Sequence, residues 1–165
     1  MAQNQSDLPV TLSVFDRLID AEPYDSRELP LSRAASVRLL KQGICRDLEW
    51  LLNTRRVAEV PDDSVRELNR SVYVFGLPDF TAYSLSSPKD QSKLLRALQL
   101  AVKTFEPRLA NVRIVSVEVV SAGSRTLRFR IDGLLMMDPS PEHVSFDTAL
   151  ELTSGEYKVK RDGNA

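Results

Sequence analysis

The sequence is poor in the residues that build metal centres and nucleophilic active sites. His143 is the only histidine and Cys45 the only cysteine among 165 residues. A zinc site or a Ser-His-Asp triad would therefore depend on a single imidazole or a single thiol. One cysteine also excludes an internal disulfide framework and is typical of a reducing compartment. We therefore expect neither a metal site nor a bound cofactor.

Glycine is scarce, long apolar runs are absent, and the charge is balanced. The six glycines stand apart from one another, so no glycine-rich loop is available to bind a phosphate. A net charge of −1 supplies no overall field that would attract nucleic acid or an anionic membrane. No apolar run reaches the roughly 20 residues that span a bilayer, and no signal segment opens the sequence. We expect a cytoplasmic protein with no membrane insertion, which recognises its partners through local surfaces.

What remains is the composition of one globular domain preceded by an arm. A hydrophobic content of 42% over 165 residues is enough for a substantial core. Near the N-terminus, Pro23 and Pro30 bracket an acidic linker that cannot form a continuous helix. We therefore divide the chain into an N-terminal arm and linker, residues 1–31, and a single domain, residues 32–165.

The arm contains a short amphipathic segment. Leu12, Phe15, Leu18 and Ile19 recur at helical spacing, and Ser13 is placed to cap a helix. A segment joined to its domain in this way either folds back on that domain or docks into a groove of another protein. The sequence leaves both alternatives open.

Two longer helices are predicted in the first part of the domain. Ser32 is the expected N-cap of the first, which ends near residues 53–56. Ser87 followed by Pro88 is a specific start signal for the second, which runs to Glu106. The apolar stripes are Val37, Leu40, Ile44, Leu48, Leu51 and Leu52 in the first helix and Leu94, Leu98, Val102 and Phe105 in the second.

Between these helices the helical periodicity fails. Residues 72–80 are predicted to be an apolar loop across the core, with a short helix around residues 63–70. A loop of this length in a compact domain often has a function.

After Arg108 the period of the apolar residues changes from 3.6 to 2, which predicts strands. Val115, Val117 and Val119 are expected to share one face of the first strand, and Gly133 to form a bulge in the second. The result is an α+β fold with two layers, in which helices pack on one face of a mainly antiparallel four-stranded sheet. The predicted strands are residues 111–121, 125–137, a third that contains residues 144–152, and a short terminal strand with Tyr157 and Val159.

The junction between the last helix and the first strand carries the sequence Glu106-Pro107-Arg108. The helix macrodipole disfavours a carboxylate at this end, so a cation or backbone donors should answer Glu106. Pro107 stops the helix. Arg108 then leaves the helix end with a planar fork suited to bidentate carboxylate binding.

Glu106 also has the position of a candidate acid in a glycoside hydrolase. That chemistry needs two carboxyl groups about 5 to 9.5 Å apart. The candidate companions are Glu118, Asp132 and Asp147. Arg108 opposes this role, because a neighbouring cation favours the ionised carboxylate over the protonated acid.

The predicted strands carry the cations that a nucleic-acid-binding face would need, namely Arg113, Arg125, Arg128 and Arg130. Phe129 alternates onto the opposite face from Arg128 and Arg130, which is contrary to a stacking platform. We therefore expect a solvated or partner-facing surface and no nucleic-acid binding.

Six segments, in this order, resemble TssE, the small baseplate subunit of bacterial type VI secretion systems. That family is related to the phage baseplate wedge proteins once labelled lysozymes. The resemblance extends from about residue 11 to 160. The segments are SVFDRLID (13–20), CRDLEWLLNTR (45–55), YVFGLPDF (73–80), FEPRL (105–109), FRIDGLL (129–135) and VSFD (144–147).

The resemblance implies a structural subunit and not an enzyme. Such a subunit joins the other wedge subunits and docks the contractile sheath at the cytoplasmic face of the inner membrane. The family's Glu-Pro-Arg motif corresponds to Glu106, Pro107 and Arg108 and is implicated in holding the wedge core together. Substitutions there are then expected to weaken assembly more than folding.

The sheath contact implied by the resemblance is strand addition at an open sheet edge, which we place near Tyr157 and Val159. Phe15, Leu18 and Ile19 of the arm are further candidates for partner contact. Two alternatives remain, a peptidoglycan hydrolase that uses Glu106 and a small regulator that sequesters another protein.

Overall fold

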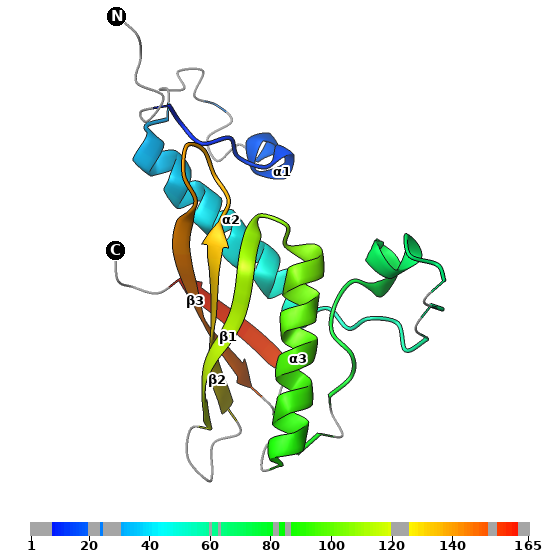
Figure 1. The fold of residues 1–165 in the computed structure, drawn as a ribbon. Coiled ribbons are helices and arrows are strands. Elements are labelled where there is room, and N and C mark those ends of the chain that lie inside the picture. The colour runs from blue at the N-terminus through cyan, green and yellow to red at the C-terminus, as the bar shows by residue number, and fades with distance from the viewer. Residues whose placement is uncertain are drawn as a thin grey trace, which may run out of the picture.

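The computed structural model describes residues 8–19, 24, 31–59, 61–62, 64–80, 83–84, 87–119, 126–151 and 155–161. It confirms the α+β prediction, with helices packed on one face of a four-stranded sheet (Figure 1). The helices are α1 (Val14–Leu18), α2 (Arg33–Asn53) and α3 (Pro88–Phe105), and two 3₁₀ turns are η2 (Leu68–Arg70) and η3 (Val72–Val74). The strands are β1 (Leu109–Val119), β2 (Thr126–Leu135), β3 (Glu142–Glu151) and β4 (Glu156–Arg161).

The two long helices begin where the sequence predicts. The Ser32 hydroxyl accepts a hydrogen bond from the Ala35 N–H at 3.2 Å, which caps α2. The Ser87 hydroxyl caps α3 in the same way, with proline as the first helical residue. At the other end of α3, Glu106 is the C-cap, so Pro107 stops the helix as predicted.

The sheet is an antiparallel meander in the order β1-β2-β3-β4, so β1 and β4 are its edges. One face is apolar and packs against α2 and α3, and the other face is not covered by any described helix. Thr148 lies among the apolar side chains, and its Oγ1 has no hydrogen-bond partner in the described part of the chain. The inward strand residues include Leu127, Phe129, Ile131, Leu135, Val144, Phe146, Leu150, Tyr157 and Val159.

The bulge beside Gly133 lies in β1 and not in β2. Asn111 and Val112 together oppose the single residue Gly133. Asn111 has a φ of 53°, a left-handed conformation that asparagine tolerates better than most residues. A Cβ at Gly133 would lie 3.3 Å from the carbonyl oxygen of Ala110. The prediction therefore places the bulge in the wrong strand. Gly133 of β2 leaves room for a bulge in the neighbouring strand, β1.

A second register shift lies between Val115 and Val117. Val115 pairs with Arg130 of the outer face and is 40% exposed. The prediction that Val115 lies on the same face as the two following valines is therefore wrong. Val112 and Ile114 pack against the core in this part of β1.

The loop between α2 and α3 only partly follows the prediction. A 3₁₀ turn at Leu68–Arg70 replaces the short helix, and Val72 is 87% exposed, so the apolar loop does not lie across the core from its start. Leu77 is the residue of this loop that enters the core. The preceding Gly76 has a φ of +104°, and a Cβ there would collide with the carbonyl of Thr54.

Several predicted features lie outside the described residues. They are most of the acidic linker, residues 120–121 at the end of the first predicted strand, Arg125 at the start of the second, and Leu152 at the end of the third.

Candidate functional site

The N-terminal arm lies against α2 (Figure 1). In the segment before α1, the Val10 N–H donates to the Ser36 hydroxyl at 2.9 Å. The Ser13 hydroxyl caps α1 by accepting from the Asp16 N–H at 3.0 Å. Of the two alternatives that the sequence leaves open, the structure shows the arm folded back on its own domain.

Asp16 is the residue that holds α1 on α2. Its carboxylate pairs with Arg46 Nη1 at 2.8 Å. It also lies directly over Gly43, where a Cβ would be 2.7 Å from Asp16 Oδ2. A glycine inside a helix costs about 1 kcal/mol relative to alanine, and here it allows the close approach of the arm. The signal that sequence reasoning missed is this glycine inside an otherwise regular helical pattern.

We expect acid to release the arm. Burial acts to raise the pKa of Asp16, but the Ser13 hydroxyl and Arg46 outweigh it, so the pKa lies below its ordinary value of 3.8. The docked carboxyl therefore binds fewer protons than the free one, and docking is lost as the pH falls through the docked pKa. The only tryptophan, Trp50, reports this because its ring lies 5.8 Å from that of Phe15.

Trp50 fluorescence should change below about pH 4, before far-UV circular dichroism reports loss of the domain. The Asp16→Asn variant is the control, and it should show the released signal already at neutral pH. A Trp50 signal that follows only global unfolding would contradict the role of Asp16.

Glu106 is buried, with 3% of its surface exposed, and Arg108 forms an ion pair with it. Arg108 Nε donates to Glu106 Oε1 at 2.6 Å, and Nη2 donates to Oε2 at 2.5 Å. Nη2 also reaches Asp47 Oδ2 at 2.6 Å. The hydrogen bonds to Glu106 are the main cause that raises the pKa of Arg108. As predicted, a cation therefore neutralises the carboxylate at the helix end. The guanidinium of Arg108 bonds carboxylates of its own chain, Glu106 and Asp47.

Five charged side chains form a continuous series from the arm to the end of α3. Arg46 joins Asp16 to Asp47, with a distance of 2.8 Å to each carboxylate. Asp47 in turn reaches Arg108, which holds Glu106. We call Asp16, Arg46, Asp47, Arg108 and Glu106 the charge chain. It couples the position of the arm to the Glu106-Pro107-Arg108 corner, because each member bonds the next.

An apolar groove of about 440 Å³ runs beside the charge chain. Two aromatic pairs line it, Phe15 with Trp50 and Phe75 with Phe105, at centroid distances of 5.8 and 5.2 Å. Arg46 lies over the Phe15 and Trp50 rings, 4.8 and 5.2 Å from their centroids. We call this the aromatic groove, and its lining also includes Ser13, Asp47, Leu48, Leu51, Glu106, Pro107 and Arg108.

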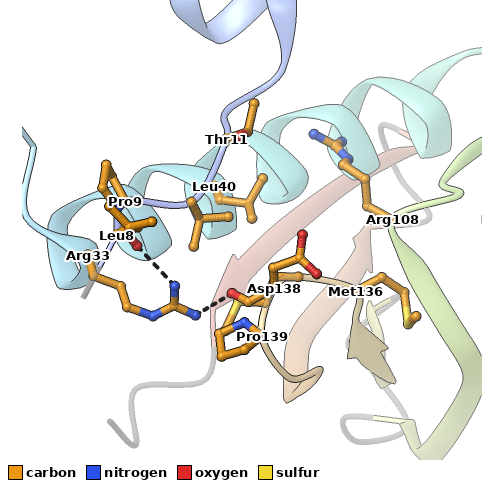
Figure 2. A pocket seen from close by; sticks show the side chains of 11 residues that line it. Leu8, Pro9, Thr11, Arg33, Leu40, Arg108, Met136, Asp138 and Pro139 are labelled. Carbon is orange, nitrogen blue, oxygen red and sulfur yellow. Dashed lines mark hydrogen bonds between the residues drawn. The ribbon is translucent and has the colours of Figure 1, made fainter. Parts of the chain in front are cut away.

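A second hollow, of about 710 Å³, lies between the arm, α2 and the loop after β2 (Figure 2). Arg33 Nη1 donates to the Leu8 carbonyl at 3.0 Å and Nη2 to the Asp138 carbonyl at 2.5 Å, so Arg33 ties the arm to that loop. Arg108 lines both hollows. The arm is therefore attached to α2 by Arg33 and Ser36 before α1, and by the ion pair of Asp16 with Arg46 within it.

The predicted partner-contact residues do not all come together. Phe15, Glu106, Pro107 and Arg108 line the aromatic groove, whereas Leu18 at the end of α1 and Ile19, its C-cap, are exposed outside the lining. No pattern in the sequence assigns Trp50, Phe75 or Phe105 to a site. Their proximity depends on how the arm, α2, α3 and the intervening loop pack.

Tyr157 and Val159 lie on an edge strand, as the strand-addition hypothesis requires, but their side chains are buried. Burial raises the pKa of Tyr157. Asn53 bonds both backbone groups of Tyr157, and the Cys45 thiol donates to the Val159 carbonyl at 3.2 Å. Side chains of α2 therefore already bond part of the backbone along this edge of the sheet.

The geometry gives no support to hydrolysis. Asp132 and Asp147 lie on the outer face of the sheet, and the strand register places Glu118 opposite Arg128. Glu106 lies at the end of α3, in the helical layer, and is bonded to Arg108. The candidate companions therefore do not converge on Glu106.

The described residues contain no group of three histidine, cysteine, aspartate or glutamate side chains that could hold a metal ion. None of their helices is long and apolar enough to cross a membrane.

A family model described as baseplate wedge protein gp25 matches residues 38–140, which is more than half of the chain. The matched span includes most of α2, all of α3, β1 and β2, and the Glu106-Pro107-Arg108 corner. Comparison with curated proteins gives no match. The chain therefore belongs to the baseplate wedge protein gp25 family.

Proposed function

We propose that this protein is a structural, non-enzymatic subunit of the baseplate wedge of a type VI secretion system. In this role it joins other wedge subunits, docks the contractile sheath and acts at the cytoplasmic face of the inner membrane. The family match supports the baseplate role, and the six TssE-like segments support the type VI assignment. The observation that carries the proposal is the aromatic groove beside the charge chain.

The aromatic groove has the features of a contact site for a neighbouring subunit. Phe15 and Trp50 are about half exposed, and an apolar surface bordered by charges is typical of protein interfaces. Tryptophan and arginine are enriched among the residues that dominate binding energy. Arg108 is 24% exposed and Pro107 is exposed, so both remain accessible to a partner, whereas buried Glu106 positions Arg108.

The experiment is co-purification with the remaining wedge subunits. The Trp50→Ala and Phe15→Ala variants should each weaken the complex by about 2 kcal/mol, or roughly 30-fold, because they remove aromatic surface from the groove. Both side chains are about half exposed, so the melting temperature should change little.

The matched controls are Val72→Ala and Leu100→Ala, which remove apolar side chains that are exposed outside the groove. They should co-purify like the wild type. Wild-type assembly by the two groove variants would show that the groove is not the wedge contact.

Sheath docking is the second part of the proposal, and we assign it to strand addition at the margin of β4 near Tyr157 and Val159. Backbone hydrogen bonds supply most of the affinity in this mode. Because Asn53 and Cys45 already bond backbone groups there, the incoming strand meets a partly occupied edge.

A further inference from the structure

Around one hollow on the outer face of the sheet, basic side chains outnumber acidic ones. The strand register places Arg128 and Arg130 of β2 and Lys158 and Lys160 of β4 on this face, with Asp147 of β3 between them. Four basic side chains and one carboxylate give a formal charge of +3 in a protein whose net charge is −1. The positive charge is therefore concentrated locally.

These residues line a hollow of about 550 Å³, which we call the basic hollow. Across the strands they form two rows. In one row, Asp147 stands between Lys160 and Arg130 and bonds Arg130 Nε at 2.8 Å.

In the other row, Ala149 stands between Lys158 and Arg128, and Glu118 of β1 is opposite Arg128 on its other side. The two cations are about 10 Å apart at the backbone, since neighbouring strands are separated by 4.7–4.9 Å. A methyl group neither neutralises them nor fills the space between their long side chains. This row therefore leaves room for an anionic group from outside.

Three of the four cations lack a partner within the described structure. Arg128, Lys158 and Lys160 are exposed, and none of them makes an ion pair or a side-chain hydrogen bond with a described residue. Like charges close together on one sheet face repel one another. A carboxylate-bearing ligand would remove that repulsion, and the local field would speed its association.

The spacing of the cations indicates the form of this ligand. Arg128 and Arg130 are two residues apart on one strand, as are Lys158 and Lys160 on another, so each pair is separated by about 7 Å along its strand. An extended polypeptide presents side chains on one side at the same interval. Acidic residues at alternate positions would therefore match either pair.

Nucleic acid fits this surface less well. Binding of single strands depends on exposed aromatic rings, each worth about 1 to 3 kcal/mol per stacked base. Phe129 is the aromatic residue of the hollow, and it is 3% exposed with its ring against Tyr157 in the core.

We propose that the basic hollow binds an extended acidic segment of a partner protein, with carboxylates at alternate positions. This surface is separate from the aromatic groove, with which it shares no lining residue. The inference goes beyond the proposed wedge contact, because it assigns a second partner surface with its own chemistry.

The test is fluorescence anisotropy with the full chain and a labelled octapeptide of alternating glutamate and serine, at about 50 mM salt, where charges are weakly screened. The peptide should bind saturably. The Arg128→Gln/Lys158→Gln variant should lose affinity at least about tenfold, because two unpaired cations are removed. Both side chains are exposed, so an unchanged melting temperature is expected.

The matched control is Lys89→Gln/Arg96→Gln, which removes one lysine and one arginine that are exposed on α3. It should bind the peptide like the wild type, and an eight-nucleotide oligothymidylate should bind more weakly than the peptide. Absence of saturable peptide binding, or an equal loss in the control variant, would overturn the proposal. Tighter binding of the oligothymidylate would assign the face to nucleic acid and would overturn it as well.

Discussion

Replacing Arg108 with alanine is expected to lower the free energy of unfolding by about 3 to 5 kcal/mol. Arg108 bonds both carboxylate oxygens of Glu106, which is 3% exposed. Its loss leaves a buried carboxylate without a cation, at a helix end where the macrodipole also disfavours negative charge. Urea denaturation at neutral pH measures the change.

Arg55→Ala is the matched control for this prediction. Arg55 makes an ion pair of similar length with Asp79, at 2.8 Å, but both side chains are well exposed. Exposed pairs contribute at most about 1 kcal/mol. In the Glu106→Gln/Arg108→Ala variant the buried charge is absent, so this variant should be more stable than Arg108→Ala alone. A loss below about 1 kcal/mol for Arg108→Ala would mean that water solvates the Glu106 carboxylate.

This result would reverse an expectation drawn from the family resemblance. The motif alone suggests that substitutions at Glu106 and Arg108 weaken assembly more than folding. The structure shows that these residues bond each other and Asp47 first. An assembly defect in such variants therefore has to be measured on the folded fraction, and Phe15 and Trp50 provide the cleaner test of the interface.

The elements of the fold that depend on local chemistry could be predicted from the sequence. Ser32 and Ser87-Pro88 start helices because a side-chain oxygen near its own helix end satisfies a backbone N–H there. The alternation of Leu127, Phe129 and Ile131 with charged residues marks β2 because one face of the sheet is buried and the other is not.

The irregularities of β1 could not be predicted because they depend on pairing between strands. Asn111 is a normal strand residue by its neighbours in sequence, and only its position opposite Gly133 shows that it lies in a bulge. Because a register shift separates Val115 from Val117, Val115 faces outward although the alternation places it with the following valines.

In the candidate site, too, the features that depend on local sequence could be predicted and those that depend on distant contacts could not. A carboxylate at a helix end followed by proline and arginine is visible locally, so the Glu106-Pro107-Arg108 corner could be singled out. The contribution of Asp47, 61 residues from Arg108, could not. The docking of the arm depends on contact between Asp16 and Gly43 in another helix, and sequence periodicity carries no information about that pairing.

Replacing Asn53 with alanine is expected to lower the free energy of unfolding by about 2 to 4 kcal/mol. Asn53 Nδ2 donates to the Tyr157 carbonyl at 2.9 Å, and Oδ1 accepts from the Tyr157 N–H at 2.8 Å. Without the amide, two backbone groups of a buried residue lose their partners. Asn69→Ala is the control, because Asn69 also donates to two backbone carbonyls but in an exposed loop, and it should cost less than about 1 kcal/mol.

The Asn53→Ala variant also tests the proposed sheath contact at the β4 edge. Asn53 bonds both backbone groups of Tyr157, so these groups point away from β3. They therefore point toward the open side of β4, where a new strand would pair. Vacating them offers an incoming strand up to two more hydrogen bonds, each worth about 0.5 to 1.5 kcal/mol. Folded Asn53→Ala protein should therefore bind sheath subunits roughly tenfold more tightly in a pull-down titration. Unchanged binding would exclude this part of the β4 margin and move the contact to β1, the other edge of the sheet.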